Sequence, residues 1–285
     1  MRAGVLGSPI AHSLSPYLHR AAYQAMGLDG WSYEALECDE ARLPGLLRTL
    51  RPLRGEVPED EGAWAGLSLT MPLKRVVLPL LDSVSDLAVE VGGANTVVFR
   101  DGASHGDNTD VYGIERALAE AGVPAPRSAT VLGGGATAAS ALAALRGLGL
   151  YSATLLVRDP ARAGETAGVA ERLGMALAVE TFDKLDVSTR VDLVVSTLPG
   201  GAADAFAARL ARVPALFDVV YSPWPTSAAA AVQTAGGTVV GGFAMLLHQA
   251  VRQVELMTGR TDVPVEAMRA AGEAEILRRA ATRTG

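Results

Sequence analysis

Hydrophobic residues in the second half of the chain gather in short runs, and the segments between these runs are rich in alanine. The runs consist of β-branched and other apolar residues, as in strands buried within a sheet. Five of them are predicted strands: Thr130–Leu132, Thr154–Val157, Leu193–Val195, Leu216–Val220 and Thr238–Val240. The alanine-rich segments between them suit helices. This alternation predicts βαβ units around a parallel sheet.

The first half of the chain also mixes strands and helices. Gly4–Gly7 is a predicted strand, and Ser15–Met26 is a predicted helix in which Ser15 caps the N-terminus and Pro16 occupies the first turn. This half contains no glycine-rich nucleotide loop. The pattern as a whole predicts an α/β protein.

A domain boundary is predicted near residues 110 to 127. Glu120–Pro126 holds the glycine and prolines of a helix end followed by a connector. Beyond the last predicted strand, a helical stripe from Leu247 to Met257 ends at Gly259, and a final helix follows Pro264. No further strand of the second-half sheet is predicted after these helices, so they do not connect two strands of that sheet. The pattern leaves open whether they pack on the first half of the chain.

Composition and charge exclude several classes of protein. Hydrophobic residues make up 49% and charged residues 20% of the 285 residues, which is a globular composition. The net charge of −6 comes without any block of like charges, so no nucleic-acid partner is expected. The uncharged stretches 128–145 and 222–251 are interrupted by glycines, and the second also by prolines, so no membrane span is expected.

Cysteine and histidine are too sparse for a cross-link or a metal site. Cys38 is the single cysteine, and the histidines share no ligand spacing. We therefore expect neither a disulfide nor a bound metal. A single thiol suits a reducing compartment, so a cytoplasmic location is expected.

A glycine-rich loop joins the strand Thr130–Leu132 to an alanine-rich helix. The loop Gly133-Gly134-Gly135-Ala136-Thr137-Ala138 has the pattern G-x-G-x-x-A. The first glycine permits a tight turn, the second lets the backbone approach a pyrophosphate, and the small Ala138 allows the helix to pack closely on the strand. The strand before and the helix after the loop favour dinucleotide binding over an ordinary glycine-rich turn.

The end of the next strand indicates which dinucleotide is bound. An NAD-selective site usually places an acid there, on the ribose 2′-hydroxyl, but Arg158 stands at this strand end and Arg162 follows one turn later. Both guanidinium groups suit a 2′-phosphate, which favours NADP. Asp159 would repel that phosphate if its carboxylate faced the ribose, so NAD stays open as the alternative.

Candidate catalytic groups come from the first half of the chain and from the domain boundary. Thr70 and Lys74 place a hydroxyl and an amine four residues apart, in a turn that enters a helix, and Asp110 lies where a cleft between domains is expected. A lysine beside a carboxylate stays charged yet can pass a proton to a reacting oxygen. Taken singly, each of these residues would more often be an ordinary surface residue.

Six segments, in order along the chain, resemble motifs of the shikimate dehydrogenase family. They are Gly7–Pro16 with its serine pair, Thr70–Lys74 (T-x-P-x-K), Gly93–Thr96, Asn108–Asp110 (N-T-D), Tyr221–Thr226 (Y-x-P-x-x-T), and Gly242–Gln249. The resemblance spans nearly the whole chain. It implies an N-terminal α/β substrate-binding and catalytic domain of residues 1–110 plus 243–285, and a Rossmann-type NADP-binding domain of residues 111–242.

The resemblance also implies a role for individual residues. Ser13 and Ser15 would bind the substrate carboxylate, Lys74 would transfer the proton, and Asp110 would hold both the lysine and a ring hydroxyl. The remaining substrate contacts would be Thr70, Asn95, Tyr221 and Gln249. The cofactor contacts would be Gly133, Gly134, Gly135, Ala136, Thr137, Arg158, Arg162, Thr197, Val219, Gly242 and, more weakly, Asp86.

The reaction that the resemblance implies is the reversible reduction of 3-dehydroshikimate to shikimate by NADPH, a step of chorismate and aromatic amino acid biosynthesis. The chain departs from the family pattern at two positions that matter here. Ser68 stands where the family typically has asparagine, and Val157 replaces the asparagine of an N-R-T cofactor segment. The substrate class is therefore better defined than the choice of cofactor.

Several alternatives stay open at this point. One is a quinate/shikimate dehydrogenase that prefers NAD, or an enzyme for an amino-substituted analogue, because a changed ring substituent alters only one or two contacts. Another is a non-catalytic sensor of a shikimate-like acid, against which the retention of Lys74 and Asp110 argues. An unrelated two-domain dehydrogenase would leave the serine pair and Gln249 unexplained. A monomer and a homodimer are equally compatible with the sequence.

Overall fold

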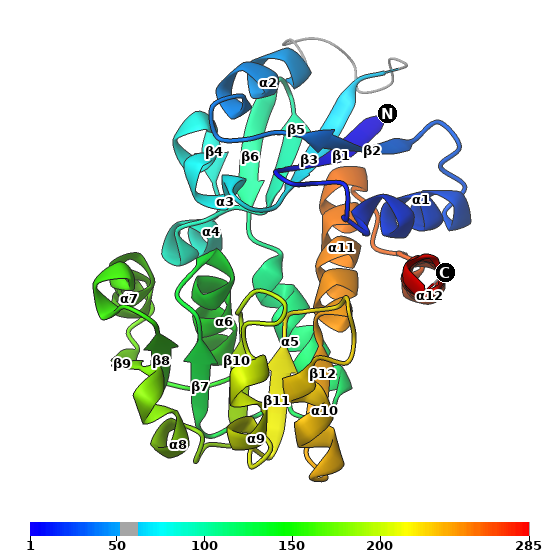
Figure 1. Ribbon diagram of the computed structural model, residues 1–285. Coiled ribbons are helices and arrows are strands. Elements are labelled where there is room, and N and C mark those ends of the chain that lie inside the picture. Colours follow the sequence, from blue (N-terminus) through cyan, green and yellow to red (C-terminus); the bar gives the residue numbers. More distant parts are fainter. Residues whose placement is uncertain (52–61, 285) are drawn as a thin grey trace. The chain divides into compact units, whose positions relative to one another are not determined.

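The computed structural model describes residues 1–51 and 62–284 and divides into two compact units (Figure 1). Unit 1 comprises Met1–Thr109 together with Gln249–Gly285, and unit 2 is the continuous segment Asp110–His248. Each unit contains a six-stranded sheet. The α/β class predicted from the sequence is confirmed.

The sheet of unit 1 combines parallel and antiparallel pairs of strands. Its strands are β1 (Arg2–Gly7), β2 (Ser32–Glu37), β3 (Trp64–Leu69), β4 (Ser83–Val84), β5 (Thr96–Arg100) and β6 (Ala103–Asp107), in the order β2-β1-β3-β5-β6-β4. Strand β1 runs parallel to β2 and β3, whereas β5 runs antiparallel to β3 and β6. Only β1 corresponds to a predicted strand.

The helices of unit 1 cover an apolar core. They are α1 (Ser15–Ala25), α2 (Leu43–Leu50), α3 (Leu73–Val76), the 3-10 turn η1 (Leu78–Leu80), α4 (Asp86–Val91) and α12 (Val265–Thr284). The core includes Leu6, Leu67, Leu73 and Val97, none of which is exposed. The C-terminal helix α12 packs against α1, on the same unit (Figure 1).

Helix α1 begins at Ser15 as predicted, but its cap differs from the prediction. Ser15 is the first helical residue, and the capping position before it is Leu14, whose side chain makes no cap hydrogen bond. The hydroxyl oxygen of Ser13 instead accepts a hydrogen bond from the Ser15 backbone N–H at 3.3 Å. The capping hydroxyl thus lies two residues earlier than predicted, because Ser13 is still outside the helix.

Unit 2 is built on a fully parallel sheet, which confirms the prediction from the hydrophobic pattern. Its strands are β7 (Ala129–Leu132), β8 (Ser152–Val157), β9 (Ala176–Thr181), β10 (Leu193–Ser196), β11 (Ala215–Asp218) and β12 (Thr238–Gly241), in the order β12-β11-β10-β7-β8-β9. Strand β9 is not among the predicted strands, because its residues alternate between exposed and half-buried positions at the sheet edge.

In unit 2, one helix precedes the first strand, and the other helices and turns follow the strands. They are α5 (Asp110–Glu120), α6 (Ala136–Gly147), η2 (Pro160–Arg162), α7 (Gly164–Arg172), η3 (Phe182–Lys184), α8 (Leu185–Ser188), η4 (Asp204–Phe206), α9 (Ala207–Leu210) and α10 (Ser227–Thr234). Every residue from Ala138 to Leu145 of α6 is buried, which explains why this helix is built of small residues. No helix in the described part of the chain is long and apolar enough to cross a membrane.

Two predicted element ends can be compared with the structure. Strand β11 ends at Asp218 rather than Val220, because the Asp218 carboxylate accepts a hydrogen bond from the Val220 N–H at 3.2 Å and turns the chain. The long helix α11 (Gly242–Thr258) ends before Gly259, as predicted, and Gly259 has a φ of 72°. Residues 242–248 of α11 belong to unit 2, and residues 249–258 belong to unit 1.

Candidate functional site

The predicted substrate residues of unit 1 follow strand ends that meet at one edge of its sheet. Strands β1 and β3 are parallel, so their carboxyl ends lie at the same edge. Strand β5 is antiparallel to β3, so its amino end lies there too, and the carboxyl end of β6 joins them. Ser13 and Ser15 follow β1, Thr70 and Lys74 follow β3, and Asn95 precedes β5. The topology therefore gathers residues that are up to about eighty positions apart in the sequence.

Backbone hydrogen bonds hold these strand ends in register. The Thr70 N–H donates to the Leu6 carbonyl at 2.9 Å, and the Leu69 N–H donates to the Asn95 carbonyl at 2.7 Å. On the next strand, the Asn95 N–H donates to the Asp107 carbonyl at 3.1 Å. The backbone at Thr70 and Asn95, two of the predicted substrate residues, is thus hydrogen-bonded directly to the sheet.

Asn95 is oriented by hydrogen bonds on both sides of its amide. It is 1% exposed, and its Oδ1 accepts from the Thr109 N–H at 2.7 Å and from the Thr96 hydroxyl at 2.9 Å. Its Nδ2 donates to the Oε1 of Gln249 at 2.9 Å. The structure therefore brings together two of the predicted substrate residues, Asn95 and Gln249, although they are 154 positions apart.

Lys74 sits in the short helix α3, directly after the end of β3, and its backbone is fixed from the neighbouring loop. Its carbonyl accepts a hydrogen bond from the Ala94 N–H at 2.8 Å. A Cβ at Gly93 would lie 3.3 Å from that carbonyl oxygen, so a small residue is favoured there. Asn108 secures the same loop, because its Nδ2 donates to the Gly93 carbonyl at 2.8 Å. The motifs around Lys74, Gly93 and Asn108 thus form one hydrogen-bonded assembly.

A buried polar network lies beside these residues, and the sequence analysis did not identify it. The Tyr33 hydroxyl donates to Ser68 Oγ at 2.7 Å, and Ser68 Oγ donates to Gln253 Oε1 at 2.8 Å. Gln253 Nε2 in turn donates to the Thr96 hydroxyl at 3.2 Å. Ser68, the departure from the family pattern, therefore has a definite function here, which is to link a tyrosine on β2 to a glutamine on α11.

Histidine 19 belongs to the same network and is uncharged. Its Nε2 lies 3.3 Å from Gln253 Oε1, and its ring stacks on Tyr33 with a distance of 3.9 Å between centroids. Burial lowers the pKa of His19 to about 3, although the hydrogen bond with Gln253 opposes the shift. A detectable signal for this network was the position of Gln253, one helical turn after Gln249.

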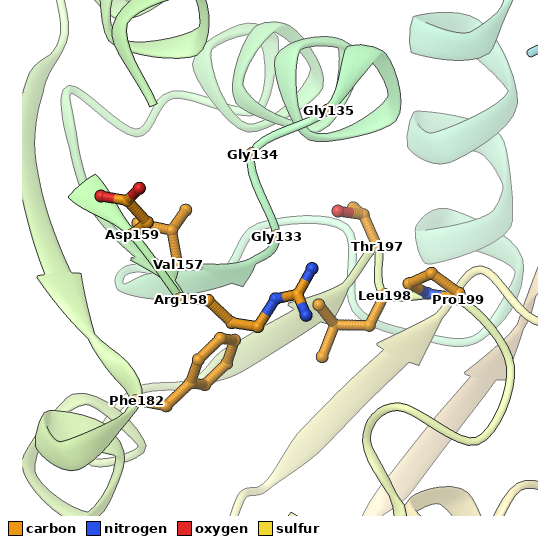
Figure 2. Close-up of a pocket in the computed structure, with 10 residues that line it drawn as sticks. All are labelled: Gly133, Gly134, Gly135, Val157, Arg158, Asp159, Phe182, Thr197, Leu198 and Pro199. Atoms are coloured by element: carbon orange, nitrogen blue, oxygen red, sulfur yellow. The ribbon is translucent and has the colours of Figure 1, made fainter. Parts of the chain in front are cut away.

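The predicted cofactor residues of unit 2 gather at the carboxyl ends of its parallel strands. Strand β7 has β8 as its neighbour on one side and β10 on the other, so the order of the strands reverses direction at β7. The carboxyl ends of these strands therefore form the topological switch point of the sheet, where ligands of such sheets bind. A cavity of about 380 Å³ opens here (Figure 2), a size within the usual range for ligand sites. Its lining residues are Gly133, Gly134, Gly135, Val157, Arg158, Asp159, Phe182, Thr197, Leu198 and Pro199.

The glycine-rich loop has the geometry that its sequence predicts. Gly133 has a φ of 99°, and a Cβ there would lie 2.7 Å from Thr197 Oγ1. The Thr197 hydroxyl itself donates to the Leu132 carbonyl at 2.8 Å. A Cβ at Gly135 would meet nothing within 4 Å, so the space beside this residue is open at the N-terminus of α6. The open backbone N–H groups of a helix start suit a pyrophosphate, so the loop fits a dinucleotide.

Arg158 and Asp159 occupy different parts of this site. Figure 2 shows the Arg158 side chain extending across the cavity, between Phe182 and Leu198. The Asp159 carboxylate points away from the Arg158 guanidinium and from the centre of the cavity. Asp159 Oδ1 accepts a hydrogen bond from the Ala161 N–H at 3.0 Å and so caps the turn η2. Arg162 closes this turn, and its side chain lies outside the described part of the structure.

Phe182 is a cavity-lining residue that the sequence analysis did not identify. It begins η3 after the unpredicted strand β9, and its ring stacks on Phe206 with a distance of 4.9 Å between centroids. Strand β9 runs parallel to β8, so its carboxyl end lies beside that of β8 and places Phe182 at the cavity. Because β9 was not predicted from the sequence, Phe182 could not be predicted as a cavity residue.

The other predicted residues of unit 2 also lie at strand or helix ends. Asp110 is the first residue of α5 and is 1% exposed. Tyr221 is half-buried in the loop after β11, and this loop is anchored at Asp218, whose carboxylate accepts from the Thr226 hydroxyl at 2.8 Å. Burial raises the pKa of Asp218. Val219 and Gly242 adjoin each other, because a Cβ at Gly242 would overlap the Val219 carbonyl.

Ala136 and Thr137 form the first turn of α6, beside the glycine-rich loop. Asp86 is exposed in the first turn of α4 and belongs to unit 1, so the structure does not group it with the cavity-lining residues of unit 2. The predicted catalytic pair is likewise divided between the units, with Lys74 in unit 1 and Asp110 in unit 2.

Comparison with known proteins identifies the family of this chain. The family model described as the shikimate dehydrogenase substrate binding domain matches residues 5–97, and that described as the shikimate 5′-dehydrogenase C-terminal domain matches residues 242–271. A shikimate dehydrogenase (NADP(+)) from Oleidesulfovibrio alaskensis is 35% identical over 268 residues, which are 90% of this chain and 89% of that protein.

Solved structures agree with the match in sequence. The crystal structure of shikimate dehydrogenase from Mycobacterium tuberculosis has a TM-score of 0.85 at 43% identity and covers 96% of this chain and 99% of its own. A quinate dehydrogenase from Corynebacterium glutamicum in complex with NAD has a TM-score of 0.84 at 30% identity, again covering 96% of this chain and 99% of its own. On the family models, the sequence identity and the shared fold, this chain belongs to the shikimate dehydrogenase family.

Proposed function

We propose that this protein is an NADP-dependent shikimate dehydrogenase, which reversibly reduces 3-dehydroshikimate to shikimate in the biosynthesis of chorismate and the aromatic amino acids. The observation that carries the proposal is the polar sheet edge of unit 1, where the serine loop follows β1 and Thr70 and Lys74 follow β3. At the same edge, Asn95 precedes β5 and is hydrogen-bonded to Gln249 of α11. Unit 2 supplies a dinucleotide site of ordinary size and geometry. We assign the substrate domain to unit 1 and the cofactor domain to unit 2.

The polar edge suits a small acid that carries several hydroxyl groups. Ser13 and Ser15 would bind its carboxylate, while Thr70, Asn95, Tyr221 and Gln249 would contact the ring hydroxyls. Asn95 is well suited to this task, because its amide is held from both sides and cannot rotate without breaking hydrogen bonds. Fixed donors and acceptors discriminate strongly between ligands with and without a hydroxyl, since a missing partner leaves a buried polar group unpaired.

Lys74 is assigned the proton transfer. A bound reduced nicotinamide would supply a hydride for the carbonyl carbon of the substrate. As the carbonyl electron pair shifts to its oxygen, the ammonium group of Lys74 would donate a proton to that oxygen to give the hydroxyl of shikimate. Water returns a proton to the lysine. Asp110, a carboxylate at the start of α5, would accept a hydrogen bond from a ring hydroxyl and so orient the substrate.

NADP is proposed as the cofactor because of the opposite orientations of Arg158 and Asp159. The Arg158 guanidinium extends across the cavity, where it suits a 2′-phosphate and the face of an adenine. Asp159 caps η2, so its carboxylate is used by its own turn. With the acid turned away, the main obstacle to a 2′-phosphate is removed. We also propose a cytoplasmic location, on the single cysteine of the chain.

The proposal is tested by measuring the rate of reduced-cofactor formation with shikimate or quinate as substrate and NADP or NAD as acceptor. We expect the highest kcat/KM with shikimate and NADP. In the Lys74→Met variant, kcat should fall about 10²- to 10⁴-fold, which is the usual contribution of a general acid. Lys184→Met is a matched control, because the chain has only these two lysines and Lys184 is exposed and paired with Asp183.

Other outcomes would identify the alternatives. Higher kcat/KM with NAD than with NADP would show that Asp159 reads the ribose despite its capping bond. Higher kcat/KM with quinate than with shikimate would contradict the proposed substrate. Binding of shikimate without turnover in any of the four combinations would overturn the assignment as an enzyme and favour a ligand sensor.

A further inference from the structure

The last described helix carries an unusual group of charged residues on its buried side. Glu275 of α12 is only 4% exposed, yet its carboxylate accepts hydrogen bonds from two arginines. Arg278 Nε donates to it at 2.7 Å, and Arg279 Nε donates to it at 2.5 Å. The Arg279 guanidinium also lies over the Tyr17 ring of α1, 5.5 Å from the ring centroid. The hydrogen bonds that Glu275 accepts, with Arg278 the largest contribution, lower its pKa to about 2, so it remains charged and fixed at neutral pH.

The two arginines differ in what else they contact. Arg278 also donates from Nη2 to Glu275, at 2.8 Å, and its side chain is 64% exposed. Arg279 is 19% exposed and directs its two terminal nitrogens to another part of the chain. Its Nη1 donates to the His12 carbonyl at 2.7 Å, and its Nη2 donates to the Ser13 carbonyl at 3.3 Å. One planar guanidinium thus joins a buried carboxylate on α12 to two successive carbonyls of the loop between β1 and α1.

This loop carries Ser13 and leads into Ser15, the residues assigned to the substrate carboxylate. Its first part is fixed to the sheet, since the Ser8 N–H donates to the Met71 carbonyl at 3.0 Å and the Ile10 N–H donates to Glu37 Oε2 at 3.0 Å. On the α12 side, Arg279 connects the exposed residue His12 and the following Ser13 to the rest of unit 1.

We propose that Arg279 is a positioning residue for the carboxylate end of the substrate, and that it acts by clamping the carbonyls of His12 and Ser13 while Glu275 and Tyr17 hold it in place. A peptide group is planar, so fixing its carbonyl also fixes the direction of the N–H on the other side of the same peptide bond. The clamp therefore sets the orientation of the peptides on both sides of Ser13. Its positive charge also lies next to the loop that would receive an anion.

The inference rests on the proposed function, and its test uses two arginines of one helix. In Arg279→Met, the KM for shikimate should rise about 5- to 20-fold, as expected for the loss of charge-assisted hydrogen bonds. The kcat and the KM for NADP should change by no more than about twofold, because Arg279 contacts neither the assigned proton donor nor the nucleotide cavity. Arg278→Met removes a cation from the same carboxylate without touching the loop, and all three constants should stay within about twofold of the wild type.

A conservative variant separates the clamp from general stability. Arg279→Lys keeps the charge, but its single ammonium group cannot reach the carboxylate and both carbonyls in one plane, so its KM for shikimate should lie between those of the wild type and Arg279→Met. A structural role alone would lower the melting temperature of the variants without this ordered change in KM. An unchanged KM in Arg279→Met, or an equal rise in Arg278→Met, would overturn the inference.

Amide hydrogen exchange of the segment 9–17 provides a readout that needs no turnover. In the free protein, exchange of this segment should be faster in Arg279→Met than in the wild type or in Arg278→Met, because the loop loses its contact with α12. If the wild-type protein did not act on shikimate, the proposed function would fail, and the exchange rates alone would decide on the clamp. Equal exchange in the two methionine variants would refute it.

Discussion

The two polar edges of this protein are built by different means. In unit 1, buried side chains hold one another, as in the chain of hydrogen bonds from Tyr33 through Ser68 to Gln253 and on to Thr96. In unit 2, the cavity is lined on one side by the three glycines between β7 and α6, which expose their backbone, and on the others by side chains such as those of Arg158 and Phe182. A hydroxyl-rich acid is recognised by fixed side-chain groups, whereas a pyrophosphate needs only N–H groups and space. We therefore expect mutations at the cavity of unit 2 to change the KM for NADP, and mutations in the network of unit 1 to change the KM for shikimate and the stability of the protein.

Among the changes that distinguish the two regions, the largest effect on binding is expected from a methyl group at the glycine-rich loop. In Gly133→Ala, the new Cβ would lie 2.7 Å from Thr197 Oγ1 at a φ of 99°, so the loop must shift and the KM for NADP should rise at least about tenfold. The KM for shikimate should change little. Gly236→Ala is the matched control, because Gly236 also has a positive φ, 88°, but a Cβ there would meet nothing within 4 Å. Steady-state kinetics measure the KM for NADP in both variants, and an equal rise in both would contradict the role given to the contact between residue 133 and Thr197.

A mutation in the buried network of unit 1 should change substrate binding less than Gly133→Ala changes cofactor binding, but it should lower the stability of the protein. Gln253→Leu removes the partner of Ser68 and Thr96 and leaves buried hydroxyls unpaired, which should lower the free energy of unfolding by about 1–3 kcal/mol. The KM for shikimate should rise several-fold, because the Asn95–Gln249 pair loses its neighbour, while the KM for NADP stays constant. Urea unfolding and kinetics measure both changes. Gln24→Leu, at an exposed position of α1, should alter neither.

The smallest effect at neutral pH is expected at His19, which changes only the pH dependence of stability. The pKa of His19 is about 3 in the folded protein and 6.5 when exposed, so the unfolded chain binds more protons than the folded one between these values. The stability from keeping His19 neutral is therefore complete above pH 6.5 and is lost as the pH falls, by about 1.4 kcal/mol per pH unit. His19→Phe keeps a ring against Tyr33 but binds no proton, so its free energy of unfolding should fall less steeply below pH 6.5. Parallel slopes for the two proteins in urea unfolding would contradict this assignment.

Elements with strong periodic patterns could be predicted from the sequence. The buried strands of unit 2 and the helix end at Gly259 follow from runs of apolar residues and from glycine chemistry, and the structure has them in place. Strand β9 was not predicted because it lies at the edge of the sheet. An edge strand pairs with only one neighbour and buries little surface, so its residues show no apolar run. The loss of β9 also concealed Phe182, which enters the cavity at the end of that strand.

The side-chain networks of unit 1 could not be predicted, for a different reason. The partners Ser68 and Gln253 are 185 positions apart, and Arg279 is 267 positions from His12. Neither pair has a local spacing that distinguishes it from ordinary surface or helix residues. Family motifs point to the individual substrate residues, but the groups that hold those residues in position become visible only when the strands are placed side by side. The orientation of Asp159 likewise depended on a turn that the sequence did not reveal.

The path of the chain through α11 has a consequence for how the protein is made. Unit 2 is one uninterrupted segment, whereas unit 1 is completed only by residues from Gln249 onward, including the helix that packs on α1. During synthesis, which proceeds from the N-terminus, unit 2 can fold on the ribosome while the first hundred residues still lack their last helix. Slow release of the chain would therefore expose the uncovered face of α1 to the solvent and to chaperones for longer than any part of the nucleotide-binding sheet.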